Sequence, residues 1–182
     1  MPTYISLLRG INVSGKNIIK MADFKTRLSS LGFQNVQTYI QSGNIVFDAP
    51  TTKVSTLEER ISSLIHDVYG FDVPVMVFNS SVWKTVWESN PWLNDPEKDL
   101  AYMHVTFLGD KPSGEAINLL AEVEAGKEEF QLMNHWLYLY MPDGYGRAKL
   151  TNGFIEKKLK IRATTRNWKT VGKLFGMLAA VS

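Results

Sequence analysis

The stretch that decides the fold is "VQTYIQSGNIVF" (residues 36–47). Two β-prone runs, Val36–Ile40 and Ile45–Phe47, flank Ser42-Gly43-Asn44, where Gly and Asn tolerate the positive φ of a tight turn. The pattern predicts a hairpin of two antiparallel strands. A parallel nucleotide-binding sheet is therefore disfavoured here, because its strands need long crossovers.

The segments on either side extend the hairpin to a complete unit. Tyr4–Leu8 and Val73–Phe78 are apolar runs typical of strands. One helix is predicted before the hairpin and another after it, the second begun by a Thr56–Glu59 capping box. The apolar helix faces are Met21, Phe24, Leu28 and Leu31, and then Val54, Leu57, Ile61, Leu64, Ile65 and Val68. The order βαββαβ is that of a ferredoxin-like plait.

The rest of the chain repeats this order less clearly. A short helix, Val82–Trp87, precedes a connector rich in turn formers. Further strands are predicted at 102–108, 130–133 and 136–141, and helices around 116–123, 155–159 and 168–178. The last strand of this unit is expected to be short or missing. We predict an α+β fold of two ferredoxin-like α-β plait subdomains, at 1–80 and 101–182, joined by a connector at 81–100, with an appended C-terminal helix on the second.

Composition limits the class of protein. The chain has 182 residues, 45% of them hydrophobic, and no cysteine, which excludes disulfides and thiolate metal sites. No stretch resembles a signal peptide or approaches 18 consecutive apolar residues. We expect a cytoplasmic protein without a membrane partner.

Charge is distributed unevenly behind a net charge of +2. Residues 1–80 carry +1, residues 81–145 carry −7, and residues 146–182 carry +8. A basic tail can meet phosphates, or it can pair with the acidic middle of its own chain or of a neighbouring copy. The last alternative predicts a homo-oligomer.

The first strand is followed by "RGINVSGKN" (residues 9–17), which approaches the phosphate-binding pattern G-x-x-x-x-G-K-[S/T]. Asn17 stands where that pattern needs the hydroxyl that holds magnesium. The following residues to Lys20 are expected to be extended, whereas a phosphate-binding helix would start at the Gly-Lys. A nucleotide-hydrolysing loop is thus disfavoured. The loop can still form an anion-binding nest, or it can be a solvated connection.

The sequence contains no recognisable motif for a metal site or a catalytic nucleophile. His66, His104 and His135 fall on different elements without the spacing of metal ligands. The sequence has neither a G-x-S-x-G elbow nor an H-E-x-x-H motif. We expect no metal and no cofactor.

A second polar stretch, "DGYGRAKLTNG", begins at residue 143. Its turn presents Arg147 and Lys149, and Thr151 or Asn152 can cap the next helix. Thr164–Asn167 is expected to cap the last helix. A helix start beside an arginine is a natural anion site, although ordinary capping explains the same residues.

The two polar stretches together resemble the bacterial family called domain of unknown function sixteen ninety-seven. The likeness lies in "YISLLRGINVSGKNIIKMADFKTRLSSLGFQNVQTYIQSGNIVF" and "GRAKLTNGFIEKKL…ATTRNWKTVGKL". It implies two α-β plait subdomains and no established activity. The family's motifs fall on Arg9, Gly10, Asn12, Lys16, Asn17, Gln41, Ser42, Gly43, Asn44, Arg147, Lys149, Thr151, Asn152, Thr165, Arg166 and Asn167. Ala148 departs from the serine that similar sequences carry.

The leading hypothesis is a module that binds a phosphate-bearing ligand, a nucleotide or a nucleic-acid segment, in a pocket shared by the two stretches. Tyr39, Phe47, Tyr138 and Tyr140 are candidates to stack on bases. The alternatives are a phosphate-processing enzyme with Asp48, Asp143 or Glu156 as base, and a structural homo-oligomer. The expected ligand-binding residues are Arg9, Asn12, Lys16, Asn17, Gln41, Ser42, Asn44, Arg147, Lys149, Thr151, Asn152, Arg166 and Asn167.

Overall fold

The computed structural model describes residues 1–180, which form two compact units. The first unit consists of Met1–Thr85 and residues 173–180, and the second of Val86–Gly172. The boundaries fall inside two continuous helices, α3 (Ser80–Glu88) and α6 (Trp168–Ala179).

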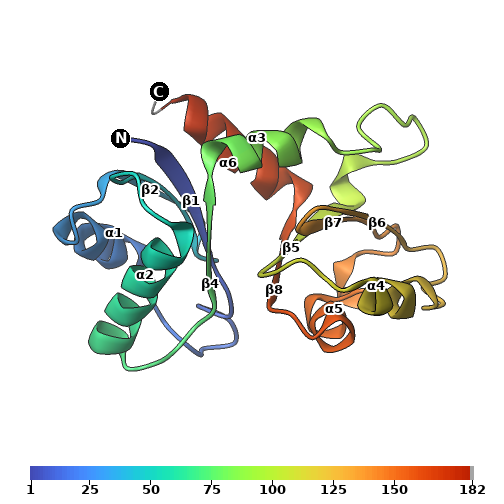
Figure 1. The fold of residues 1–182 in the computed structure, drawn as a ribbon, viewed down its shortest axis with the longest axis horizontal. Coiled ribbons are helices and arrows are strands. Elements are labelled where there is room, and N and C mark those ends of the chain that lie inside the picture. The colour runs from blue at the N-terminus through green and yellow to red at the C-terminus, as the bar shows by residue number, and fades with distance from the viewer. Residues whose placement is uncertain (181–182) are drawn as a thin grey trace. The chain divides into compact units, whose positions relative to one another are not determined.

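The fold is mixed α+β, with one four-stranded antiparallel sheet in each unit (Figure 1). The remaining elements of the first unit are β1 (Thr3–Leu8), α1 (Met21–Ser30), β2 (Gln34–Tyr39), β3 (Asn44–Asp48), α2 (Val54–Tyr69) and β4 (Val75–Asn79). Those of the second are η1 (Leu100–Tyr102), β5 (Met103–Leu108), α4 (Gly114–Ala121), β6 (Glu129–Met133), β7 (Trp136–Tyr140), η2 (Tyr145–Arg147), α5 (Asn152–Leu159) and β8 (Ala163–Asn167). The predicted hairpin is confirmed as β2 and β3.

The two sheets have the same strand order. The first runs β2-β3-β1-β4 and the second β6-β7-β5-β8, so the first strand of each unit lies between its third and fourth. In register, Ile5 of β1 lies opposite Val46 and Phe78. Residues on alternate sides of each strand face opposite sides of the sheet, and α1 and α2 cover one side of the first sheet (Figure 1).

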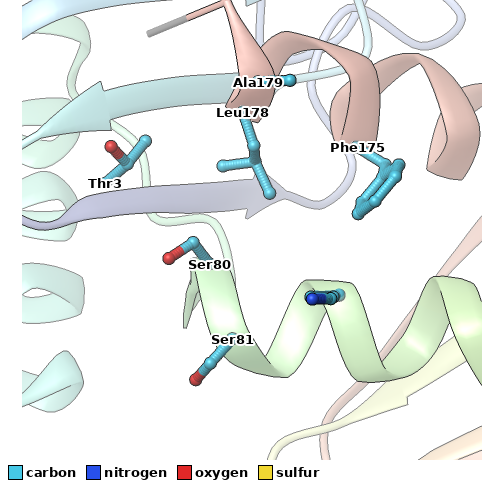
Figure 2. A pocket seen from close by; sticks show the side chains of 7 residues that line it. Thr3, Ser80, Ser81, Phe175, Leu178 and Ala179 are labelled. Atoms are coloured by element: carbon cyan, nitrogen blue, oxygen red, sulfur yellow. The ribbon is translucent and has the colours of Figure 1, made fainter. Parts of the chain in front are cut away.

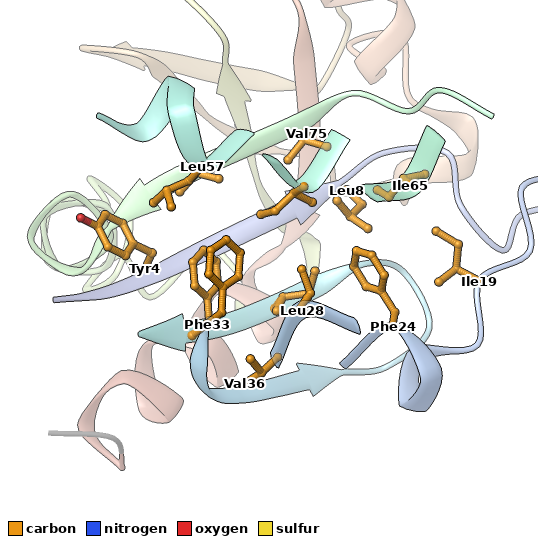
Figure 3. Packing of buried hydrophobic residues seen from close by; sticks show 14 of the residues in the cluster. Tyr4, Leu8, Ile19, Phe24, Leu28, Phe33, Val36, Leu57, Ile65 and Val75 are labelled. Carbon is orange, nitrogen blue, oxygen red and sulfur yellow. The ribbon is translucent and has the colours of Figure 1, made fainter. Parts of the chain in front are cut away.

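The core of the first unit lies between that side of the sheet and the two helices (Figure 3). Phe24 and Leu28 of α1 and Leu57 and Ile61 of α2 are completely buried. Phe33 stacks on another core ring, Phe47, with 4.6 Å between centroids. The helical spacing of these apolar residues is what turns both helices toward the sheet.

The second unit has a smaller core of the same kind. Leu137 and Leu139 of β7 pack with Ile155 and Leu159 of α5, and Leu120 of α4 joins them. Of α4, only Leu120 is fully buried, so this helix contributes much less apolar surface than α1 or α2.

A helix directly follows the fourth strand in both units. The sequence predicted both, the first as the short helix Val82–Trp87 of the connector and the second as an appended helix. Asn79 ends β4, and its side-chain oxygen accepts the Val82 N–H at 2.9 Å. Asn167 ends β8, and its side-chain oxygen accepts the Thr170 N–H at 2.8 Å. In each case the last strand residue is also the helix cap, which satisfies an N–H at the start of the helix.

The end of the central strand is also built alike in both units. Leu8 donates its N–H to the Gly43 carbonyl and Arg9 to the Pro74 carbonyl, at 2.8 and 3.1 Å. Leu108 and Gly109 donate in the same way to the carbonyls of His135 and Arg162, both at 2.8 Å. These bonds bring the hairpin turn and the start of the fourth strand against the end of the first.

Two local predictions are wrong. Thr164–Asn167 belongs to a five-residue strand, β8, and only Asn167 caps the helix. The Thr56–Glu59 capping box is absent, because α2 begins earlier, after Lys53, without a side-chain cap. Polar β8 showed no apolar alternation in the sequence, yet its pairing with β5 is complete from Ala163 to Asn167.

We predict that Gly43→Ala lowers the free energy of unfolding by about 3–5 kcal/mol, from left-handed strain plus overpacking. Gly43 has φ +77°, and an added Cβ would lie 2.5 Å from the Leu8 Cβ. Gly10 has φ +72° and open space around it, so Gly10→Ala should cost only about 1 kcal/mol. Urea unfolding of both variants measures the difference, and equal losses would contradict the close approach.

Candidate anion-binding site

The glycine-rich segment between β1 and α1 folds as a small hairpin, here called the finger (residues 10–17). Val13 and Lys16 form an antiparallel bridge. The Asn12 N–H donates to the Asn17 carbonyl at 3.1 Å, and the Lys16 N–H to the Val13 carbonyl at 2.9 Å. The two residues at the tip, Ser14 and Gly15, have φ of 51° and 73°. Two central residues with positive φ are the mark of a type I′ turn.

This geometry is unlike that of a nucleotide-hydrolysing loop. Such a loop leads its free amides straight into a helix start, whereas α1 begins only at Met21 and the amides of Asn12 and Lys16 are used within the finger. The sheet beside it is antiparallel throughout. This geometry gives no support to a nucleotide-hydrolysing loop.

The side chain of Asn12 holds the finger to its surroundings. Its Nδ2 donates to the carbonyls of Ile19 and Gln41, at 3.0 and 2.8 Å. Its Oδ1 accepts the Ile19 N–H at 2.9 Å. Asn17 closes the base of the finger, since its Nδ2 donates to the Gly10 carbonyl at 2.9 Å. Both predicted ligand residues therefore use their amide groups to shape the backbone.

The β2–β3 turn contributes the next predicted residues. Asn44 is fully buried, and its Nδ2 donates to the Tyr39 carbonyl at 3.1 Å and to the Ser42 hydroxyl at 2.9 Å. Gln41 is exposed, and its carbonyl is the acceptor for Asn12. The structure thus joins finger and turn, and leaves Gln41 and Lys16 as the predicted residues there whose side chains are turned to water.

Three exposed aliphatic residues were not foreseen. Val13 and Ile18 lie on and beside the finger, with 58% and 55% of their surface exposed, and Ile40 lies on the turn with 51% exposed. Ile40 has φ +50°, which is strained for a β-branched residue. Because about half of its surface is exposed, Ile40 is not held in this conformation by burial in the core. The sequence signal was an isoleucine directly before the turn formers.

The segments that form the finger and the β2–β3 turn carry no acidic residue. No Asp or Glu occurs among residues 1–22 or 34–47. Within the described residues, the Lys16 ammonium makes no ion pair or hydrogen bond. Arg9 is half-buried at the base of the loop. Lys16 is therefore an uncompensated charge on a rigid support.

In the second unit, the turn after β7 carries Arg147 and Lys149, both exposed. The Lys149 ammonium donates to the Glu124 carbonyl at 2.7 Å. The Glu128 carboxylate accepts the N–H groups of Lys149 and Leu150, at 2.6 and 2.8 Å. One acidic residue thus fixes the backbone that presents these cations.

Thr151 caps α5, because its hydroxyl accepts the Phe154 N–H at 3.4 Å. The N–H of Asn152 donates to the Tyr145 hydroxyl at 2.8 Å, and its Oδ1 accepts from the Thr165 hydroxyl at 3.1 Å. Its Nδ2 is buried without a partner among the described atoms. Capping by Thr151 confirms one of the two predicted caps.

Arg166 lies on β8, opposite Val105. Its guanidinium donates to the Thr164 hydroxyl at 3.1 Å and to the Thr165 carbonyl at 3.0 Å. Burial disfavours the charged form and lowers the pKa of Arg166 to about 10. Arg166 stays charged at neutral pH, but it is embedded in its strand rather than displayed at a helix start.

The described surface is hollowed in each unit. A hollow of about 450 Å³ (Figure 2) is lined by Thr3, Ser80, Ser81, Lys84, Phe175, Leu178 and Ala179, none of which was predicted. One of about 380 Å³ is lined by Leu119, Glu122, Val123, Glu124, Lys149, Phe154 and Lys158, and includes the predicted Lys149.

The predicted stacking aromatics are wrong in two cases. Phe47 is completely buried in the first core, and the Tyr138 hydroxyl is buried and donates to the Val86 carbonyl at 2.7 Å.

Two of the carboxylates proposed as a general base hold the backbone and neighbouring side chains. Asp48 accepts from the Thr3 hydroxyl and the Asn35 amide, at 2.6 and 2.7 Å. Glu156 accepts the Ala163 N–H at 2.9 Å.

A match to a protein-family model agrees with the family resemblance of the first polar stretch. Residues 1–138 match the family model described as "Protein of unknown function (DUF1697)". The chain belongs to this family. The DUF1697 match ends before Arg147, so the second polar stretch lies outside the matched residues. Among the described residues, no group of His, Asp or Glu could hold a metal ion, and no helix is long and apolar enough to cross a membrane.

The chain is also similar to a solved structure, that of the conserved bacterial protein SP0830 from Streptococcus pneumoniae. The two are 25% identical, with a TM-score of 0.75, over 97% of this chain and 98% of that one. No curated protein matches the chain. The predicted residues form one group in each unit, and their convergence on one shared pocket stays a prediction.

We predict that Asn12→Ala lowers the free energy of unfolding by about 2–4 kcal/mol, because three hydrogen bonds are lost. Lys16→Ala should change it by less than about 0.5 kcal/mol. Asn12 has φ +54°, which alanine adopts only with strain and glycine without it. Urea unfolding compares the variants, and Asn12→Gly separates the loss of the hydrogen bonds from this strain. An Asn12→Ala variant as stable as the wild type would show that the amide does not hold the finger.

A pH effect is expected from His104, whose ring lies 5.1 Å from the Tyr145 ring. Burial lowers the pKa of His104 below its ordinary value of 6.5. As the pH falls, the unfolded chain therefore takes up the proton first, so the stabilisation is complete above pH 6.5 and is lost below it. Urea midpoints at neutral and acidic pH should fall less in His104→Gln than in the wild type. The same fall in both would exclude His104 as the cause.

Proposed function

We propose that the protein binds a phosphate-bearing ligand, a nucleotide or a nucleic-acid segment, at the finger. The observation that carries this proposal is Lys16, an unpaired ammonium on a type I′ hairpin in an acid-free part of the chain. A lysine on a fixed support contacts phosphate without reading sequence. The neighbouring Val13 and Ile40 are exposed and can cover the apolar surface of a sugar or base.

The fold proposal that accompanies this function is that the chain contains two ferredoxin-like plaits, at 1–80 and 101–182, with 81–100 as connector. These bounds differ from those of the compact units, because residues 173–180 group with the first unit. Support comes from the βαββαβ order and from the antiparallel strand order that the two sheets share. Such sheets host many functions, so the proposal of a ligand rests on the finger and not on the fold.

We place Arg147 in the same proposed function as a second phosphate contact. It is exposed in the second unit, on the turn that Glu128 fixes through Lys149 and Leu150. Each of the two cations can contact a phosphate from its own unit. The acidic residues near Lys149 make this second contact the weaker of the two.

The test is fluorescence anisotropy with a labelled single-stranded 20-nucleotide RNA, with unlabelled nucleotides and inorganic phosphate as competitors. Lys16→Ala should weaken binding roughly three- to tenfold at low salt and make the slope of log K against log salt shallower by about one. Arg147→Ala should act in the same direction.

Lys25→Ala is the matched control, because Lys25 is exposed on α1 of the same unit. It should change binding less than about twofold. Absence of binding by the wild type to every probe would refute the proposal, as would equal affinities of Lys16→Ala and Lys25→Ala.

A further inference from the structure

The second unit contains an aromatic cage around a lysine of its own chain. The Lys98 ammonium lies 4.5 Å from the centre of the Tyr140 ring and 5.5 Å from that of the Trp92 ring. It also lies 2.5 Å from Oε1 of Glu129. Only 13% of the Lys98 side chain is exposed, against 51% of the Glu129 side chain. Aromatic faces and a carboxylate are the groups that hold an ammonium ion.

Two walls of the cage are built on the sheet. Glu129 of β6 and Tyr140 of β7 are register partners, so both side chains project from the same face. Trp92 meets Tyr140 edge-on, with 6.3 Å between ring centroids and 62° between planes. Two of the three walls are therefore fixed by strand pairing, independently of the segment that supplies Lys98.

That segment is held loosely apart from its two ends. Its ends are anchored by the buried side chain of Asn90 and by the Tyr102 carbonyl, which accepts the Met141 N–H. Between them, none of residues 91–100 is buried. Its backbone hydrogen bonds are those of short-range turns, such as the bond from the Lys98 N–H to the Asp95 carbonyl. Few buried contacts oppose a local opening that withdraws Lys98 from the cage.

We propose that Tyr140, Trp92 and Glu129 form a binding site for a primary alkylammonium group, which Lys98 occupies as an exchangeable internal ligand. A primary ammonium fits better than a quaternary one, because Glu129 accepts an N–H that a quaternary nitrogen lacks. An external amine that displaces Lys98 would occupy the same place between Tyr140 and Trp92 and so keep residues 91–100 closed over the sheet. The hydrogen bond from Lys98 to Glu129 also raises the pKa of Lys98, so the occupant remains charged at neutral pH.

The proposal is tested with Lys98→Ala, which empties the cage and leaves its walls in place. Cleavage within residues 91–100 by a protease should become roughly three- to tenfold faster than in the wild type, because the contact that closes the segment is lost. n-Butylammonium should bind this variant saturably and restore slow cleavage. Tetramethylammonium should bind more weakly.

The wild type should bind n-butylammonium only at concentrations roughly tenfold or more above those that saturate Lys98→Ala, because the tethered lysine competes for the cage. Adding Glu129→Gln or Tyr140→Leu to Lys98→Ala should abolish the rescue. Lys111→Ala is the control, since it removes an exposed lysine of the same unit outside the cage. Circular dichroism establishes that each variant is folded.

Each outcome decides one part of the proposal. No saturable effect of n-butylammonium on Lys98→Ala means that the cage is not an ammonium site. Rescue that survives Tyr140→Leu places the bound amine elsewhere. If n-butylammonium slows cleavage of Lys98→Ala and yet does not bind the wild type at a hundredfold higher concentration, Lys98 is a permanent structural residue. If a lysine-containing peptide slows cleavage of Lys98→Ala and n-butylammonium does not, the ammonium group that the cage binds belongs to a protein side chain rather than to a free amine.

Discussion

The structure depends on how the N–H groups at the end of the central strand of each sheet find their partners. A buried strand end cannot leave these groups without acceptors. Leu8 and Leu108 solve this in the same way, by donating to the hairpin turn of their own unit, and the next residue donates to the start of the fourth strand. In the first unit the approach is so close that only glycine fits at position 43. The position of the candidate site follows, because this same turn receives the amide of Asn12.

The shared strand order, the equivalent strand-end hydrogen bonds and the paired caps at Asn79 and Asn167 make the two units repeats of one design. The sequence concealed this, because the repeats preserve backbone needs rather than residues. An asparagine that ends a strand and caps the next helix can do so in either sequence context. The turn residue whose carbonyl accepts the strand-end N–H, by contrast, is Gly43 in one unit and His135 in the other. A residue-by-residue comparison of the two halves of the sequence therefore finds little similarity.

Helices and apolar strands could be predicted because their burial leaves a period in the sequence, as it does for α1, α2 and the β2–β3 hairpin. β8 could not, since Thr165 and Arg166 are held by pairing and side-chain hydrogen bonds rather than by an apolar face. The finger was located correctly but understood only in part. Its asparagines suggested ligand contacts, yet the amide of Asn12 bonds to the neighbouring backbone and that of Asn17 closes the base of the finger. The cage around Lys98 left no sequence signal, because its walls come from separate strands and a connector.

The two units differ most in the link between their first strand and first helix. In the second unit this link is only residues 109–113, whereas in the first it is residues 9–20 and contains the finger. The short link shows that the architecture closes without any such projection. The longer link of the first unit is therefore an addition to the βαββαβ order that the second unit does without. The finger thus distinguishes the first unit from the second at otherwise equivalent positions of the fold.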